Sequence, residues 1–115
     1  DVERSRGLGD VYKRQDMHPF DFDGLEALTA QLKKDNTPVY LTVDLDCLDP
    51  SVFPGTGTPE AGGVTFPQLL TSLLLVSRTN VVGADINELA PMLDTSGAST
   101  ACACKVLREM LLALY

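Results

Sequence analysis

The sequence predicts an α/β protein in which a parallel β-sheet lies between helices, a three-layer arrangement. The run VYLTV at residues 39–43 is β-branched and aromatic and has no consistently polar face, as expected of a fully buried strand. A second strand-like run, VVGADI, occupies residues 81–86. Helically spaced leucines separate the two runs, so we expect a crossover unit with parallel strands and a right-handed connection.

A helix is expected before the first strand. Asp23 is placed to cap its N-terminus, with Glu26 three residues further on. The helix should end near residues 35–36, because Pro38 disfavours helical geometry in the residue before it. The apolar face of this helix consists of Leu25, Leu28 and Leu32.

Two further helices are expected after the first strand. Thr65 and Gln68 form a second capping signal, and Pro67 is tolerated in a first turn. The predicted buried stripe of this helix is Leu69, Leu70, Leu73 and Leu74. The last helix is expected at about residues 96–114. Its residues predicted to face the sheet are Ala103, Leu107, Met110 and Leu114.

Composition argues against two classes of partner. The net charge of −7 and the pI near 4.4 speak against nucleic acid, which requires clustered Lys and Arg, and no apolar run approaches the roughly 20 residues of a membrane span. Three cysteines without zinc-type spacing favour a reducing compartment, so we expect a cytoplasmic protein. Cys102 and Cys104 would point in different directions on a helix and are expected to pack rather than to bind metal.

The first 15 residues differ from the rest in charge. Residues 1–15 carry four basic and three acidic side chains, whereas the remaining hundred carry five basic and thirteen acidic ones. We therefore expect residues 1–15 to be a non-native or disordered leader, with a native loop as the alternative. Residues 16–115 are expected to be the C-terminal part of a single domain.

Three acidic residues lie at the predicted ends of the two strands. Asp44 and Asp46 are expected to project to one side of the strand, about 6.6 Å apart along the backbone, and Glu88 ends the neighbouring strand. Ligands of open parallel sheets bind outside these carboxyl ends. Two converging carboxylates can share a pair of hard cations such as Mg²⁺ or Mn²⁺. Asp-x-Asp pairs also cap loop amides, and they occur in sugar-nucleotide transferases.

Other conspicuous residues are interpreted as scaffolding. Asp49, before Pro50, is expected to fix the turn after the first strand. Asp85 is equally compatible with orienting a metal ligand and with capping a strand-end loop. The loop at residues 55–63 lacks the ending of a phosphate-binding loop, so we expect it to wall the cleft. His18 is expected at the surface or in packing.

Two long motifs resemble a known family. DLDCLDP at residues 44–50, followed by PGTGTP at 54–59, and GADINELAP at 83–91 resemble the signatures of the ureohydrolases, the arginases, agmatinases and their relatives. The resemblance runs from about Met17 to the C-terminus and is greatest to bacterial agmatinases. It implies the arginase-like α/β fold.

The resemblance also implies a chemistry and a set of roles. Asp44 would bridge two manganese ions, Asp46 would bind one of them, and Glu88 would pair with the substrate guanidinium. The reaction would convert agmatine to putrescine and urea, and such subunits form homo-oligomers. The family's remaining histidine and aspartate ligands belong to blocks that this chain lacks. We therefore expect an inactive fragment that exposes a bare strand edge and apolar surface.

Two alternatives remain open. The same chemistry could act on arginine or on guanidinobutyrate. A different class of function is a non-catalytic binding or assembly module derived from a ureohydrolase.

Overall fold

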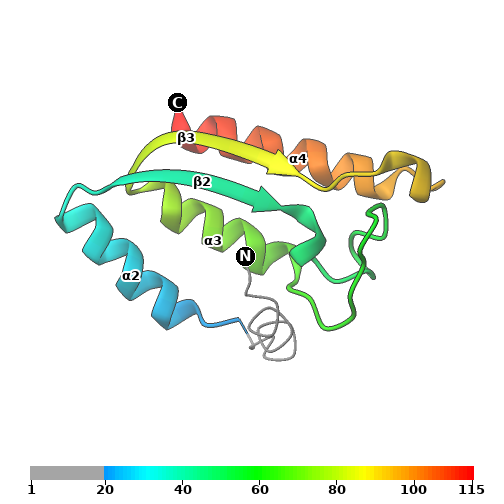
Figure 1. The fold of residues 1–115 in the computed structure, drawn as a ribbon, viewed down its shortest axis with the longest axis horizontal. Helices are drawn as coiled ribbons and strands as arrows, with labels where there is room; N and C mark the ends of the chain where they lie inside the picture. Colours follow the sequence, from blue (N-terminus) through cyan, green and yellow to red (C-terminus); the bar gives the residue numbers. More distant parts are fainter. Residues whose placement is uncertain (1–19) are drawn as a thin grey trace, which may run out of the picture.

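The computed structural model describes residues 20–115, so the predicted leader at residues 1–15 and His18 lie outside the described part. Helices and strands alternate along this part of the chain (Figure 1). In order they are α2 (Phe22–Lys34), β2 (Pro38–Asp44), the 3₁₀ turn η1 (Leu45–Cys47), α3 (Phe66–Ser77), β3 (Asn80–Asn87), the 3₁₀ turn η2 (Pro91–Leu93) and α4 (Ala98–Leu114). Within residues 20–115, no helix combines the length and apolar character needed to cross a membrane.

The two strands form a parallel pair. β2 and β3 are hydrogen-bonded neighbours and α3 connects them, which confirms the predicted crossover unit. The ladder is irregular after Val39, where Val82 is passed over, and from there Thr42 lies opposite Asp85. At the carboxyl end Asp44 lies opposite Asn87.

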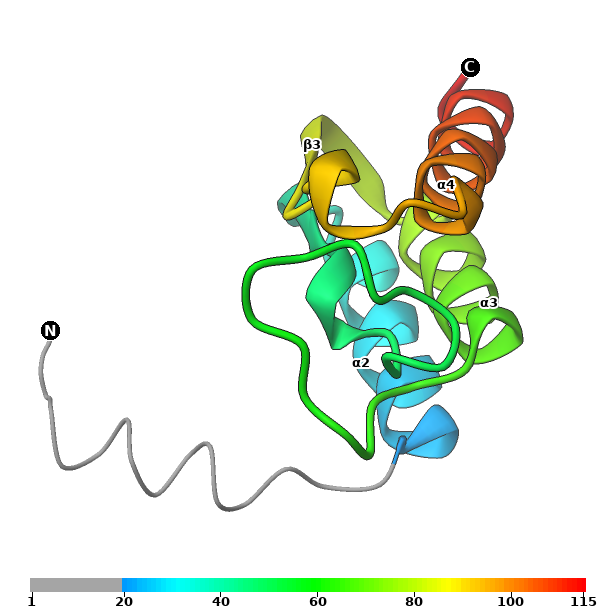
Figure 2. The same cartoon turned by 90° about the vertical axis from the view of Figure 1, so that its right-hand side faces the viewer.

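All three helices lie on one side of this sheet (Figure 2). The α/β class is therefore confirmed, but no described segment covers the second face. The prediction that residues 39–43 form a fully buried strand is wrong in this chain: Val43, on the helix side, is 4% exposed, whereas Tyr40, on the other side, is 61% exposed. Side chains alternate along a strand, so one uncovered face exposes every second residue.

The hydrophobic core lies between the helix side of the sheet, α3 and α4. Its buried members are Val43, Leu45, Leu48, Phe53, Leu69, Leu73, Ala103, Val106 and Met110. Leu45, Leu48 and Phe53 come from the segment directly after β2. Burial of each large side chain stabilises by about 1.5–3 kcal/mol, so this segment is fixed beside the sheet by its own apolar residues.

The capping predictions have different outcomes. α3 begins with the predicted capping box: the Gln68 amide donates to the Thr65 hydroxyl at 3.2 Å, and the Thr65 amide donates to the Gln68 side chain at 2.9 Å. The cap of α2 was misplaced, since Asp21 rather than Asp23 accepts from the Gly24 amide, at 2.9 Å. Asp23 lies in the first turn instead, where its charge complements the helix dipole.

The predicted helix faces are also only partly correct. In α3, Leu69 and Leu73 are buried, whereas Leu74 is exposed and Leu75 is buried in its place. In α4, which begins at Ala98 rather than Ser96, Ala103 and Met110 are buried but Leu107 is 49% exposed. Leu107 is exposed because it lines a groove that no described residue fills.

Candidate functional site

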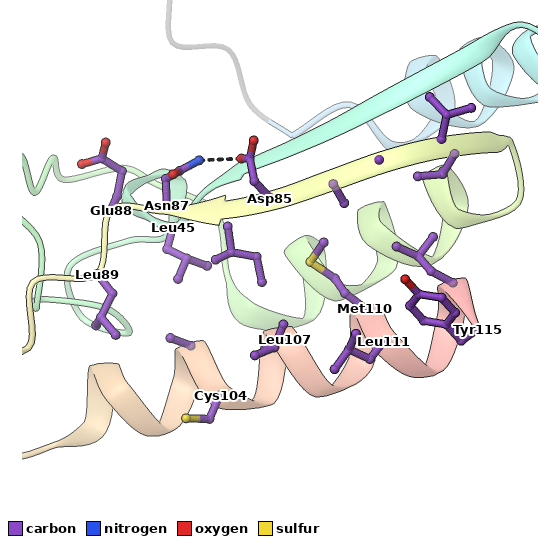
Figure 3. A pocket seen from close by; sticks show the side chains of 17 residues that line it. Leu45, Asp85, Asn87, Glu88, Leu89, Cys104, Leu107, Met110, Leu111 and Tyr115 are labelled. Carbon is purple, nitrogen blue, oxygen red and sulfur yellow. Dashed lines mark hydrogen bonds between the residues drawn. The ribbon is translucent and has the colours of Figure 1, made fainter.

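Two of the three predicted site residues meet at the carboxyl edge of the sheet. Asp44 is the last residue of β2 and lies opposite Asn87, and Glu88 follows directly. Both Asp44 and Glu88 are exposed. Figure 3 shows Glu88, Asn87 and Asp85 on the side of β3 away from α4. The uncovered face and its carboxyl edge thus bring these polar side chains together.

Asp46 reaches this edge by a different route from the predicted one. β2 ends at Asp44 and η1 begins at Leu45, so strand alternation does not extend to Asp46, and that premise of the prediction is wrong. Leu45 is fully buried, and drawing its side chain into the core turns the backbone here. The Asp46 carboxylate accepts a hydrogen bond from the Thr58 hydroxyl at 2.8 Å. The Gly/Pro-rich loop therefore contacts Asp46 through Thr58.

The backbone of Glu88 adopts an unusual conformation. Its φ angle is 83°, in the left-handed region that L-residues with a Cβ rarely adopt. Residues held in such a conformation cost energy and tend to occur at functional sites. No feature of the sequence signals this conformation, because glutamate is not a residue that favours it.

Asp85 is the centre of a hydrogen-bond network on the uncovered face. Its carboxylate accepts from the Tyr40 hydroxyl at 2.9 Å, the Thr42 hydroxyl at 2.7 Å and the Asn87 side-chain amide at 2.5 Å. The hydrogen bonds from Thr42 and then Tyr40 lower the pKa of Asp85. The hydrogen bond that Tyr40 donates to Asp85 raises the pKa of Tyr40, and the negative charge of Asp85 raises it further.

This network links two strands rather than capping a loop. Tyr40, Thr42 and Asn87 were missed by the sequence reasoning as partners of Asp85. The strand alternation in the sequence could have identified these neighbours, because it places Tyr40, Thr42 and Asp44 on one face of the sheet.

Asp49 fixes the turn after η1, which supports its scaffolding interpretation. Its carboxylate accepts from the backbone amides of Ser51 and Gly62 at 3.0 Å, from that of Gly63 at 3.3 Å and from the Ser51 hydroxyl. The hydrogen bonds from the Ser51 hydroxyl and then from the Ser51 amide are the main causes of the lowered pKa of Asp49. A side chain at Gly63 would place its Cβ 2.6 Å from the backbone of Asp49 and of Cys47, so the loop closes tightly here.

A second network joins the start of α4 to the segment after Glu88. Asp94 accepts from the amides and hydroxyls of Ser96 and Ser99, chiefly the hydroxyls, and these bonds hold its pKa well below the usual range. The fully buried Ser99 hydroxyl accepts from the Gly55 amide at 2.8 Å. The Gly55 carbonyl in turn accepts from the Ala90 amide at 2.7 Å. Sequence reasoning missed this network, although Asp-x-Ser at a helix start was a usable signal.

The described residues supply only part of a metal site. Among residues 20–115 no group of three or more His, Cys, Asp or Glu side chains is arranged to hold a metal ion. The carboxylate oxygens of Asp44 and Asp46 have the chemistry that Mn²⁺ prefers, so they fit as two members of a larger set. Two carboxylates cannot fill the coordination shells of two ions. The roles of Asp44, Asp46 and Glu88 stay predictions.

An apolar groove lies between β3 and α4, on the opposite side of β3 from the acidic groups (Figure 3). Its volume is about 780 Å³, and its lining includes Leu45, Ile86, Leu107, Met110 and Leu111. The groove, whose lining also includes the exposed Val82 on β3, bears out the expectation of open apolar surface among the described residues.

Comparison with known proteins gives consistent results. A family model described as "Arginase family" matches residues 5–113. An agmatinase from Bacillus anthracis is 48% identical over 103 residues, which cover 87% of this chain and 36% of the relative. The chain therefore spans about a third of the length of the curated relatives it matches.

Solved structures are similar to the chain over most of its length. The structure of a proposed agmatinase from Clostridium difficile superposes with a TM-score of 0.77 at 38% identity and covers 98% of this chain and 42% of that one. The arginase from Bacillus caldovelox gives a TM-score of 0.66 at 31% identity over 75% of this chain and 29% of its own. The fold predicted from the two motifs is thereby confirmed.

Proposed function

The chain belongs to the Arginase family, and we propose that it is the C-terminal part of an agmatinase-like ureohydrolase. The longer protein would hydrolyse the guanidino group of agmatine to putrescine and urea. The pairing of Asp44 with Asn87 is the observation that carries the proposal, because it brings the metal-binding candidate Asp44 and the guanidinium-binding candidate Glu88 to one edge. The names of the relatives support agmatine as the substrate.

Asp44 and Asp46 would hold manganese together with donors from outside this chain. Bound Mn²⁺ would supply Lewis-acid activation of the attacking water. The Thr58 hydroxyl donates to one carboxylate oxygen of Asp46, and the other oxygen accepts no hydrogen bond from any described residue. The side chain of Asp44 accepts no hydrogen bond from residues 20–115. Both acids therefore retain lone pairs for a metal.

Glu88 would receive the substrate. A carboxylate can bind a planar guanidinium through two parallel charge-assisted hydrogen bonds. The net charge of −7 favours a cationic substrate such as agmatine over an anionic one. The left-handed backbone of Glu88 is the kind of strained geometry found at binding sites.

Urea release by the full-length, Mn²⁺-loaded protein tests the proposal. Wild-type protein should release urea from agmatine and lose this activity on chelation of the metal. Asp46→Ala should abolish release, whereas Glu60→Ala, an acid in the exposed part of the same loop, should retain it. Full activity of Asp46→Ala would contradict the assignment of Asp46 as a metal ligand.

A close alternative is the same chemistry on another guanidino compound. The similarity to an arginase at 31% identity favours it as the second candidate. Rates of urea release from agmatine, arginine and guanidinobutyrate at equal concentrations would decide between them. A preference for arginine would replace agmatine in the proposal without changing the roles of Asp44, Asp46 and Glu88.

A non-catalytic module is the alternative from another class. The incomplete metal-binding set of residues 20–115 favours it, if the natural reading frame starts near residue 1. Residues 16–115 are proposed to belong to a single ureohydrolase domain, with residues 1–15 as a separate leader, although the family match begins at residue 5. The genomic sequence upstream of the codon for Met17 would test both points.

We propose a cytoplasmic location and a homo-oligomeric state for the full-length protein. The free thiols of Cys47, Cys102 and Cys104 suit the reducing cytoplasm. A homo-oligomeric assembly of the full-length protein follows from the family resemblance, and light scattering would measure it.

A further inference from the structure

We infer that two hydrogen-bonded anchors hold Glu88 in its left-handed conformation, and that Ser99 and Tyr40 are positioning residues for its carboxylate. The inference rests on the proposed function, in which Glu88 binds the guanidinium. Neither residue adjoins Glu88 in the chain: Tyr40 lies within β2 and Ser99 lies at the start of α4.

The first anchor holds the residue before Glu88. The backbone of Asn87 is paired with Asp44, and its side-chain amide donates to Asp85 at 2.5 Å. Asp85 is itself fixed by the hydroxyls of Tyr40 and Thr42, at 2.9 and 2.7 Å. The Tyr40 ring lies over Gly83, where an added Cβ would be only 2.8 Å from the ring. The strand end is thus fixed by main-chain and side-chain contacts together.

The second anchor holds the residue two positions after Glu88. The Ala90 amide donates to the Gly55 carbonyl at 2.7 Å, and the Gly55 amide donates to the Ser99 hydroxyl at 2.8 Å. The Ser99 hydroxyl donates onward to Asp94 at 2.6 Å. Ser99 is 0% exposed, and a Cβ added at Gly55 would be 2.7 Å from that of Ser99. The loop and helix fit together closely at this point.

Only Glu88 and Leu89 lie between the two anchors. Leu89 packs against the core, so the segment has little freedom to shift. An L-residue persists at positive φ only where its surroundings over-determine it. Loss of either anchor should let Glu88 relax to negative φ, which would turn its carboxylate away from the sheet edge.

Such a change should weaken substrate binding more than it slows the chemical step. In the full-length, Mn²⁺-loaded protein we expect Ser99→Ala to raise the KM for agmatine roughly ten- to a hundredfold, with kcat within about threefold of wild type. Tyr40→Phe removes one exposed hydroxyl and should raise KM about two- to fivefold. Ser77→Ala is the matched control, because its hydroxyl donates to the Leu74 carbonyl away from both anchors. It should leave KM unchanged.

A double-mutant cycle tests whether these residues act through Glu88. In a Glu88→Gln background, Ser99→Ala and Tyr40→Phe should cause no further rise in KM. Additive effects in that background would overturn the inference, as would an unchanged KM in both single variants. If Ser99→Ala does not fold, the cycle with Tyr40→Phe alone decides.

The same measurements separate this inference from the proposed function. Absence of urea release by the wild-type protein, or a Glu88→Gln variant with wild-type kinetics, would overturn the proposed function. A raised KM in Glu88→Gln beside a wild-type KM in Ser99→Ala and Tyr40→Phe would overturn only the positioning role.

Discussion

Tyr40 and Asp85 are joined by a 2.9 Å hydrogen bond between residues 45 positions apart. The bond depends on the irregularity after Val39, which places Asp85 opposite Thr42 and beside Tyr40 on the uncovered face. A regular ladder would pair Asp85 with Val43 and send the two polar groups to opposite faces. The polar network beside the candidate site is therefore a product of one shift in register.

The Tyr40–Asp85 bond should be visible in the ionisation of the phenol. The acceptor carboxylate raises the pKa of Tyr40 above the ordinary value of about 10. Asp85→Asn removes the negative charge, so the pKa of Tyr40 should fall towards that value. Ultraviolet titration of tyrosinate absorbance, with Tyr40→Phe to assign the transition, measures the shift. An identical titration curve for Asp85→Asn and wild type would contradict the bond.

The Asp94 network predicts a pH-dependent contribution to stability. Because the pKa of Asp94 is lowered in the folded state, its ionised form stabilises the fold above the unfolded pKa of about 3.9. That contribution is lost as the pH falls through the folded pKa. Asp94→Asn should therefore lower Tm at pH 7, and the difference from wild type should shrink at pH values below about 4.

Circular dichroism melts of wild type and Asp94→Asn across this pH range provide the measurement. A second variant, Ser96→Ala, removes the hydroxyl that contributes most to the lowered pKa while keeping the carboxylate. It should show a smaller loss of Tm with the same pH trend. A Tm difference that is constant from pH 7 to the acid range would rule out the linkage.

Relief of backbone strain should separate stability from activity at Glu88. The φ of 83° costs about 1–2 kcal/mol for an L-residue, whereas glycine adopts it freely. Glycine also raises the entropy of the unfolded chain, which costs about 0.4–1 kcal/mol. Glu88→Gly should therefore be as stable as wild type or up to about 1.5 kcal/mol more stable, while the urea release proposed for the full-length protein is lost.

Glu60→Gly is the control for this substitution. Glu60 is an exposed loop residue, and its φ is not positive. Only the unfolded-state term applies there, so denaturant titration should give a loss of about 0.4–1 kcal/mol. Equal losses in Glu60→Gly and Glu88→Gly would mean that Glu88 carries no strain.

The sequence predicts the elements well where local signals decide. The apolar runs of β2 and β3, the leucine spacing of α3 and the Thr65–Gln68 capping box all depend on neighbours within four residues. The α2 cap shows the limit of such signals. Asp21 and Asp23 both carry a suitable acceptor, and the choice between them depends on where the helix starts.

The features that were missed depend on distant parts of the chain. β2 is exposed on one face because burial of a strand is decided by what covers the sheet rather than by its own composition. Its end at Asp44 follows from burial of Leu45 in a core built by α3 and α4. The candidate site residues themselves could be picked out because motifs carry them, whereas the conformation of Glu88 depends on Ser99 and Asp85, which no local pattern connects.

Close packing at Gly63 makes this position intolerant of any side chain. A Cβ there would lie 2.6 Å from the Asp49 nitrogen and 2.6 Å from the Cys47 carbonyl oxygen, and both are backbone atoms that cannot rotate away. Gly63 does not have a positive φ, so the obstacle is space rather than conformation. Gly63→Ala should destabilise the fold by roughly 1–3 kcal/mol, as over-packing does elsewhere. In the full-length protein the shift should also displace η1 and weaken the Mn²⁺ binding that we propose for Asp46.

Gly57→Ala separates this effect from the general effect of adding a methyl group. Gly57 belongs to the same loop, and a Cβ there would have no atom within 4 Å. Replacing it should change the free energy of unfolding by no more than about 0.5 kcal/mol. Urea denaturation of both variants, with manganese content measured on the folded proteins, provides the comparison. Equal stability of Gly63→Ala and Gly57→Ala would show that the loop can move to accommodate the added methyl group. Asp49 would then not fix the position of the loop.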